Sequence, residues 1–341
     1  MSAFLVGAVI GAFFVTPLVV FYFLFLRWCD RFEPEPLWLL GLAFAWGAVF
    51  ATLFGGLSSA VGEGAVGAAL GLKAGHPIMQ AIGATVFAPV FEEGFKAIGV
   101  LVVALISALG LKEFDGALDG AIYGGVVGLG FTLTEDILYV ANQFTKEGLG
   151  GLIGLWFLRT VLLGLSYCTF TACTGLAVGI AAERGTVAKI ILPPLGLAAA
   201  MAMHAMHNGL PTFFGSGGAA VMILISWVID LGFFALLALL VMRDRATVIR
   251  ELSGELGALL RPQELALVAS YVNLGSRNLS VLFSRGFRAY RSRRDKQLAL
   301  VDLAFVKMRR RRGESGRELD AKETRLRGAI SQMNAQGIVL D

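Results

Sequence analysis

The sequence has few charged residues. Only 16% of its 341 residues are Asp, Glu, Lys or Arg, whereas 56% are hydrophobic. Soluble domains carry about 25% charged residues. This balance excludes an ordinary soluble protein, and because helices satisfy their own backbone in lipid, it predicts an all-α, polytopic membrane protein.

Other absences exclude further classes. The three cysteines, Cys29, Cys168 and Cys173, have neither a metal-ligand spacing nor a disulfide pattern. The sequence lacks the His-Glu-x-x-His motif of common zinc proteases and the Gly-x-Ser-x-Gly elbow of serine hydrolases. Its aromatic residues do not form a stacking platform, so no nucleic acid is expected as a partner.

Long apolar segments are present instead. A helix needs about 20 residues to cross a bilayer, and seven segments are long enough. They cover residues 3–26, 37–57, 78–109, 117–142, 152–182, 187–210 and 219–242. The first 26 residues have no basic start, which favours a retained span over a cleaved signal peptide. Residues 55–77 are too mixed to predict a span and are compatible with a short outer helix.

Charge divides the chain in two. Residues 1–242 contain 9 Lys+Arg and 14 Asp+Glu, a net charge of −5, whereas residues 243–341 contain 20 and 11, a net charge of +9. We therefore predict a transmembrane protease-like domain over residues 1–242 and a basic helical tail over residues 243–341. Basic segments next to spans favour the cytoplasmic side, and they attract anionic lipid. The expected location is the plasma membrane, with the C-terminus in the cytoplasm.

Three charged residues interrupt the third span. Glu92, Glu93 and Lys96 lie near the middle of the apolar run 78–109. Each such group costs roughly 2.5–3.5 kcal/mol at the centre of a bilayer, so the three must face a bundle interior, pair with one another or do chemistry. Two unpaired carboxylates so close together would not both stay ionised. We expect one glutamate to pair with Lys96 and the other to act as a base, and we assign the base to Glu93.

The fourth span combines small residues with a carboxylate. Gly120, Gly124 and Gly128 recur every four residues, a spacing that allows two helices to approach closely in lipid. Glu135 follows at nearly whole helical turns and so lies on the same face. We expect this face to pack against the third span. Arg159 is expected to form an ion pair with Glu135 or Asp136.

The sixth span carries His204 and Asn208, which are four residues apart and share a helix face. Glu93, Glu135 and His204 can all be placed at a similar depth in the bilayer. Two hydrolytic chemistries fit this set and remain open. In one, Glu93, Glu135 and His204 hold a divalent metal such as zinc that activates water. In the other, a glutamate activates the water while His204 and Asn208 stabilise the oxyanion.

These motifs, in this order, resemble the PrsW family of intramembrane proteases. The resemblance is carried by Glu92-Glu93-x-x-Lys96, by Gly130-Phe131-x-x-x-Glu135 and by the pair His204/Asn208. The last two also resemble motifs of the superfamily of CAAX prenyl endopeptidases and bacteriocin-processing proteins. The resemblance implies an intramembrane endopeptidase that cleaves a membrane-anchored protein such as an anti-sigma factor. It implies the catalytic set Glu92, Glu93, Lys96, Glu135, His204 and Asn208.

One position departs from the family pattern. Where the family has a histidine eight residues after Arg159, this chain has Tyr167, followed by the expected Thr171. The departure leaves a second reading open, in which the chain is a proteolytically silent relative that uses the fold to hold a partner helix. A proton-coupled transporter is a third reading, and the lack of a visible internal repeat disfavours it.

Overall fold

The computed structural model describes residues 2–73, 75–111, 114, 116–270 and 272–340, and these form helices without a strand. Short π-helical turns, labelled η, join several α-helices. The helical elements are α1 (Ala3–Cys29), α2 (Leu37–Ala45), η1 (Trp46–Ala51), α3 (Thr52–Ala69), α4 (Pro77–Ile82), η2 (Gly83–Phe87), α5 (Ala88–Ile106), η3 (Ser107–Leu111), α6 (Ala117–Trp156), η4 (Phe157–Leu162), α7 (Ser166–Ala182), α8 (Thr186–Ser253), α9 (Pro262–Val268), α10 (Asn273–Arg311) and α11 (Arg317–Ala335).

Within the described part of the chain, four helical stretches are long and apolar enough to cross a membrane: Ala3–Cys29, Leu37–Ala69, Ala117–Ala182 and Thr186–Ser253. The last two contain a glycine with non-helical backbone angles, Gly148 and Gly215, and each is there divided into two helices by a kink. Split at these glycines, the stretches give six segments, and the helical run 77–111 adds another. The fold is thus an all-α, multi-pass membrane bundle, in agreement with the predicted count of about seven spans.

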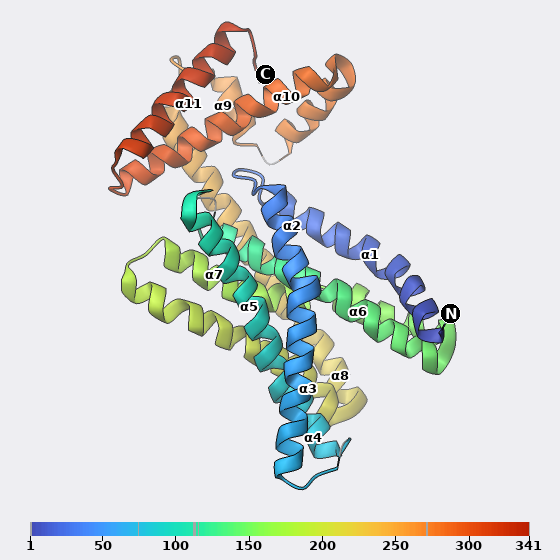
Figure 1. The fold of residues 1–341 in the computed structure, drawn as a ribbon. Helices are drawn as coiled ribbons and strands as arrows, with labels where there is room; N and C mark the ends of the chain where they lie inside the picture. Colours follow the sequence, from blue (N-terminus) through green and yellow to red (C-terminus); the bar gives the residue numbers. More distant parts are fainter. Residues whose placement is uncertain (1, 74, 112–113, 115, 271, 341) are drawn as a thin grey trace. The chain divides into compact units, whose positions relative to one another are not determined.

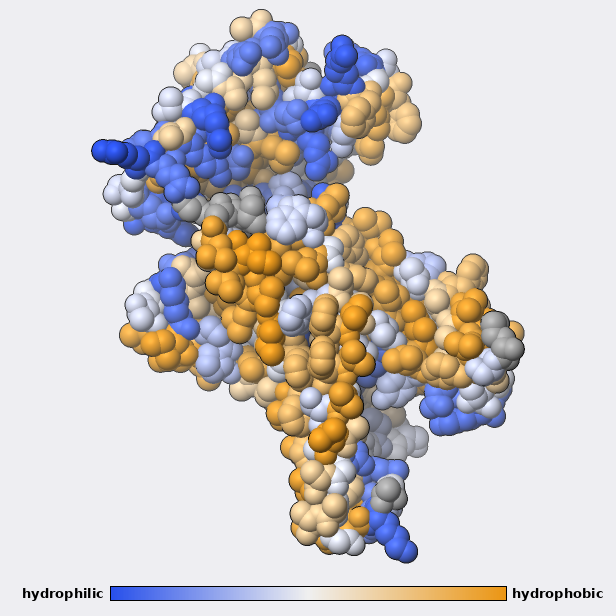
Figure 2. Space-filling view, viewed as in Figure 1, coloured by the Kyte–Doolittle hydropathy of each residue, from blue (hydrophilic) through white to orange (hydrophobic). Residues whose placement is uncertain are grey.

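The second span is longer than predicted. Helix α3 continues without a break to Ala69, through residues expected to form at most a short outer helix (Figure 1). Its glycines allow this, because Gly55 lies against Glu92, and Gly62 lies against Phe87 and Phe91. Hydrophobic side chains cover the outside of α2, α3 and α5, as expected of helices that face lipid (Figure 2).

Helix α6 lies at the centre of the membrane bundle, and nearly every residue from Ala117 to Thr132 is buried. Its glycine face was expected to pack against the third span, and this expectation is wrong. A Cβ atom on Gly120, Gly124 or Gly128 would lie within 2.6 Å of a backbone carbonyl oxygen of α7. The glycines therefore bring α6 and α7 into direct backbone contact.

The chain divides into two compact units. The first contains residues 1–30 and 35–238, and the second contains residues 31–34 and the chain from Leu239 onward. Helix α8 continues across the predicted domain boundary at residue 242. The second unit has its own apolar core, in which Leu300, Leu303 and Ile330 are fully buried.

Candidate active site

The charged triplet of α5 faces inward. Glu92, Glu93 and Lys96 are 8%, 1% and 0% exposed. Lys96 Nζ lies 2.7 Å from Glu93 Oε1, and the same ammonium lies 3.5 Å from the centre of the Phe131 ring. A buried ammonium is stabilised both by a carboxylate partner and by an aromatic face. The predicted pairing of Lys96 with one of the two glutamates is confirmed, and the partner is Glu93.

Glu93 also orients a histidine. His204 Nδ1 lies 3.0 Å from the same Glu93 oxygen, and Thr171 Oγ1 donates to the other oxygen at 3.2 Å. A carboxylate paired with Lys96 is ionised and can only accept hydrogen bonds. Nδ1 of His204 therefore carries a hydrogen atom and donates a hydrogen bond to Glu93. This tautomer leaves Nε2 of His204 as an acceptor with a free lone pair. Both oxygens of Glu93 are thus engaged, which does not favour Glu93 as the base.

Glu92 and His204 present the two free atoms of the site. Glu92 Oε2 and His204 Nε2 are buried and have no hydrogen-bond partner among the residues that the structure describes. They lie 3.8 Å apart, which is too far for a direct hydrogen bond. A water molecule at about 2.8 Å from each atom is compatible with this separation. The separation thus matches the distance that a single water bridging a carboxylate and an imidazole would span.

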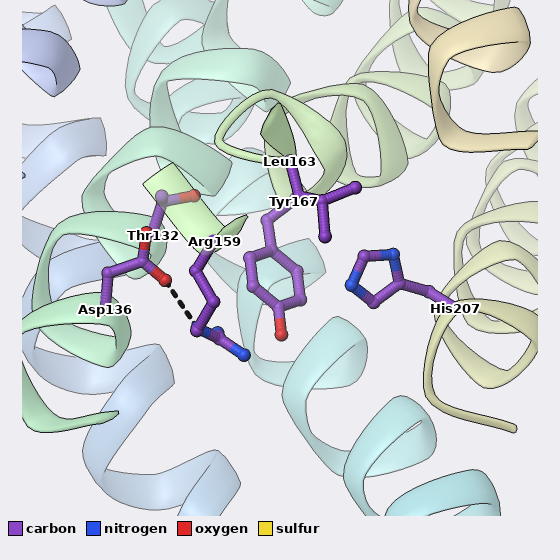
Figure 3. A pocket seen from close by; sticks show the side chains of 6 residues that line it. All are labelled: Thr132, Asp136, Arg159, Leu163, Tyr167 and His207. Carbon is purple, nitrogen blue, oxygen red and sulfur yellow. Dashed lines mark hydrogen bonds and ion pairs between the residues drawn. The ribbon is translucent and has the colours of Figure 1, made fainter. Parts of the chain in front are cut away.

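The predicted ion pair of Arg159 is confirmed and involves both carboxylates. Arg159 Nε lies 2.8 Å from Asp136 Oδ1 (Figure 3). Arg159 Nη2 lies 2.6 Å from Glu135 Oε2. Thr160 Oγ1 donates to the second Asp136 oxygen at 2.8 Å. These contacts join α6 to η4. They give Glu135 a partner of its own, separate from the group formed by Glu93 and His204.

Tyr167 lies between Arg159 and His207 (Figure 3). Its ring meets the ring of His204 edge-on, with 5.1 Å between their centres, and that of Phe131 at the same distance. A small cavity beside it leaves about 10 Å³ for the centre of a water molecule, roughly the space of one water. Tyr167 therefore packs against the histidine of the site.

Asn208 was expected to act together with His204, but the two side chains contact different segments. Its side-chain nitrogen donates to the backbone oxygen of Ala84 in η2 at 2.9 Å, whereas His204 contacts α5. The π-helical turn leaves carbonyl groups such as that of Ala84 open to such a bond. Asn208 thus ties α8 to the segment that leads into α5.

The donor atoms can be compared with those of a metal centre. Among the described residues, no group of three or more His, Cys, Asp or Glu could hold a metal ion. Glu93 is engaged with Lys96 and Glu135 with Arg159, so the predicted metal ligands Glu93, Glu135 and His204 are not brought together. Catalytic zinc takes three protein ligands, whereas the free atoms of Glu92 and His204 supply two. The residues present therefore do not fit such a centre.

One residue of the site escaped the sequence analysis. A Cβ atom on Gly55 of α3 would lie 3.0 Å from both Cα and Cγ of Glu92. A side chain at this position would push α3 and Glu92 apart by a few tenths of an ångström, so glycine allows this close approach. The signal was the glycine-rich sequence of residues 55–77, which suggested a loop or a short helix more readily than a packing surface.

Comparison with protein families gives a match, whereas comparisons with curated proteins and with solved structures find none. The match covers residues 35–240 and is to a family described as the PrsW family of intramembrane metalloproteases. This range contains every residue of the site described above and more than half of the chain. The chain belongs to the PrsW family of intramembrane proteases, and it is a membrane-embedded peptidase.

Proposed function

We propose that this peptidase hydrolyses its substrate with a water molecule held and deprotonated by Glu92, with His204 as the second contact of that water. The observation that carries the proposal is the pair of buried, unpartnered atoms, Glu92 Oε2 and His204 Nε2, 3.8 Å apart. The base is thus assigned to Glu92 and not to Glu93. Glu93 and Lys96 are positioning residues that set the tautomer and direction of His204.

The chemistry follows from these contacts. One proton of the water points to Glu92 and the other to Nε2 of His204. Glu92 takes its proton as the water oxygen forms a bond to the carbonyl carbon of the substrate. When the carbon–nitrogen bond breaks, Glu92 returns the proton to the leaving amine. Water is thereby divided between the new carboxyl and amino ends, and no other reactant is needed.

The substrate is proposed to be a membrane-anchored protein, with an anti-sigma factor as the type of substrate that the family resemblance implies. We place the protein in the plasma membrane with its C-terminus in the cytoplasm, because residues 243–341 carry a net charge of +9. A C-terminal tag that is accessible from outside intact cells would contradict this orientation. Anionic lipid is the proposed partner of the basic tail.

A silent, partner-holding relative is the second candidate, and Tyr167 favours it. The tyrosine replaces a histidine of the family pattern and packs on the ring of His204. Glu92 and His204 keep the free atoms that hydrolysis needs, and for that reason we prefer the peptidase.

The first test compares Glu92→Gln with the parent chain reconstituted in lipid vesicles with a tagged, single-span reporter protein. Cleavage is followed by mass spectrometry in ¹⁸O-labelled water, so that hydrolysis labels the new carboxylate. We expect Glu92→Gln to slow cleavage by about 100-fold or more, because it cannot accept a proton. Glu147→Gln, which changes an exposed glutamate of α6, is the matched control. Full activity in Glu92→Gln, with unchanged helix content, would overturn the proposal.

The second test concerns the metal. We expect cleavage by the parent to persist after thorough chelation, with no stoichiometric metal found by elemental analysis, since no group of three ligating side chains is brought together among the described residues. Loss of activity on chelation, restored by added zinc, would replace the glutamate mechanism with a metal mechanism.

A further inference from the structure

Helix α10 bends in its first half and exposes large apolar side chains at the bend. Gly286 has φ +82°, a conformation that L side chains rarely adopt, and it interrupts the helix. Leu279, Phe283 and Phe287 around this bend are 53%, 87% and 66% exposed. Two phenylalanines so exposed to water on a folded helical unit mark an interaction surface.

The same bend carries unpaired positive charge. Arg277, Arg285 and Arg288 are exposed and have no acidic partner within the described part of the chain. The sequence has no Asp or Glu between Glu264 and Asp295. Figures 1 and 2 show hydrophobic surface next to strongly hydrophilic surface at this end of α10. We call the surface formed by Leu279, Phe283, Phe287, Arg277, Arg285 and Arg288 the α10 elbow.

Arginines elsewhere in the second unit form ion pairs with acidic side chains of the same unit. Arg310 pairs with Glu323 at 2.8 Å, Arg311 with Glu251 at 3.1 Å, and Arg327 with Glu255 at 2.7 Å. The run of arginines at 309–312, the most conspicuous basic sequence of the tail, is therefore largely engaged in holding α10 to its neighbours. Free positive charge combined with exposed aromatic rings is a property of the elbow.

We propose that the α10 elbow binds the anionic surface of the bilayer. Its arginines would contact lipid phosphates, and its phenylalanines would enter the boundary between headgroups and acyl chains. A membrane surface is always available to this unit, because the chain enters it directly from the membrane-spanning helix α8. Aromatic rings combined with Arg and an absence of acidic residues match an anionic lipid surface better than an acidic protein.

The inference deepens the lipid contact proposed for the tail, and it does not depend on the peptidase chemistry. The test uses the full chain in nanodiscs made either of phosphatidylcholine alone or of phosphatidylcholine with phosphatidylglycerol. Amide hydrogen exchange is followed by mass spectrometry over residues 279–288, without any cleavage assay. Failure of this test therefore leaves the assignment of Glu92 and His204 untouched.

With the anionic lipid, we expect exchange over residues 279–288 to slow by about tenfold, and the protection to fall at high salt, where charge interactions are screened. Arg285→Gln/Arg288→Gln should lose the protection. Phe283→Ser should also lose the protection. The Phe283 side chain is almost fully exposed, so this change is not expected to disturb folding. The matched control, Arg317→Gln/Arg325→Gln, removes the same amount of charge from exposed positions on α11 and should retain the exchange protection.

Three results would overturn the proposal. The first is equal exchange in both types of nanodisc. The second is protection that survives in Arg285→Gln/Arg288→Gln. The third is protection that appears in detergent without lipid and rises with protein concentration, which would show that the elbow binds a second copy of the chain.

Discussion

At the scale of single residues, the buried charges of α5 are explained by their partners. Glu93 lies between Lys96 and His204, with 2.7 Å and 3.0 Å to their nitrogen atoms, so one carboxylate stabilises one cation and orients one imidazole. Removing one partner of such a buried pair typically costs about 3–5 kcal/mol. Changes at Glu93 or Lys96 therefore affect folding as well as chemistry, whereas Glu92 has a free oxygen and is the cleaner target.

The role of Tyr167, at a position where the family resemblance implies a histidine, can be tested at this scale. We expect Tyr167→Phe to retain cleavage to within about threefold, because the ring contacts with Phe131 and His204 remain and only the hydroxyl is lost. The measurement is kcat/KM on the same reporter, with thermal stability recorded in parallel. A silent parent that gains cleavage in Tyr167→His would instead support the partner-holding relative.

At the scale of elements, the contact between α6 and α7 supports the site. Gly124 lies against the backbone of Thr171, and the side chain of Thr171 donates to Glu93. The glycine face therefore acts on the site through α7, although the sequence analysis expected it to contact the third span. The spacing of glycines identifies a contact face but does not identify the helix on the other side.

Gly124→Leu tests this contact. A Cβ atom at this position would lie 2.6 Å from the backbone oxygen of Thr171, so the helices must separate. We expect a stability loss of about 1–3 kcal/mol or more, as for overpacked cores, together with loss of cleavage. Thermal unfolding in detergent and the reporter assay measure the two effects.

The control for that variant lies on the same helix. A Cβ atom on Gly154 would meet no other atom within 4 Å, and Gly154→Leu should behave like the parent. Parent-like stability and activity of Gly124→Leu would show that the close approach of α6 and α7 is not needed.

At the scale of the whole molecule, the second unit is held together by ion pairs to buried carboxylates, among them Glu255 and Glu264. Two hydrogen bonds from Arg327, with a further one from Lys307, hold the pKa of Glu255 below its ordinary value of 4.5. Burial opposes ionisation of Glu264, but the Lys296 ammonium at 2.6 Å and backbone N–H groups still lower its pKa. Both carboxylates are thus more acidic in the folded unit than in the unfolded chain.

The stability of this unit should therefore depend on pH. Lowered pKa values contribute stability that is fully present above about 4.5, and that is lost as the pH falls toward and through the lowered values. We expect hydrogen-exchange protection of α9, α10 and α11 to fall in this acidic range, after correction for the intrinsic exchange rate. Glu255→Gln should make the dependence shallower, and Glu314→Gln, at an exposed position, should leave it unchanged. Constant protection across the range would contradict the role of these pairs.

The sequence by itself determined the class of the molecule and the charged side chains that its helices must bury. Apolar length and scarce charge predicted the membrane bundle, and the cost of charge in lipid singled out Glu92, Glu93, Lys96 and Arg159. The pairings of Lys96 with a neighbouring glutamate and of Arg159 with the carboxylates of α6 followed from the same cost. These inferences succeed because they concern what each helix must bury.

Tertiary structure decided which helix meets which face. Only the packing shows that Glu93 is engaged and Glu92 free, that Glu135 belongs to Arg159, and that Asn208 holds η2. The free donor atoms likewise depend on which partners reach each side chain. Periodicity along a helix specifies the direction in which a side chain points, whereas its partner is set by contacts between residues far apart in the chain, and these arise only when the helices pack.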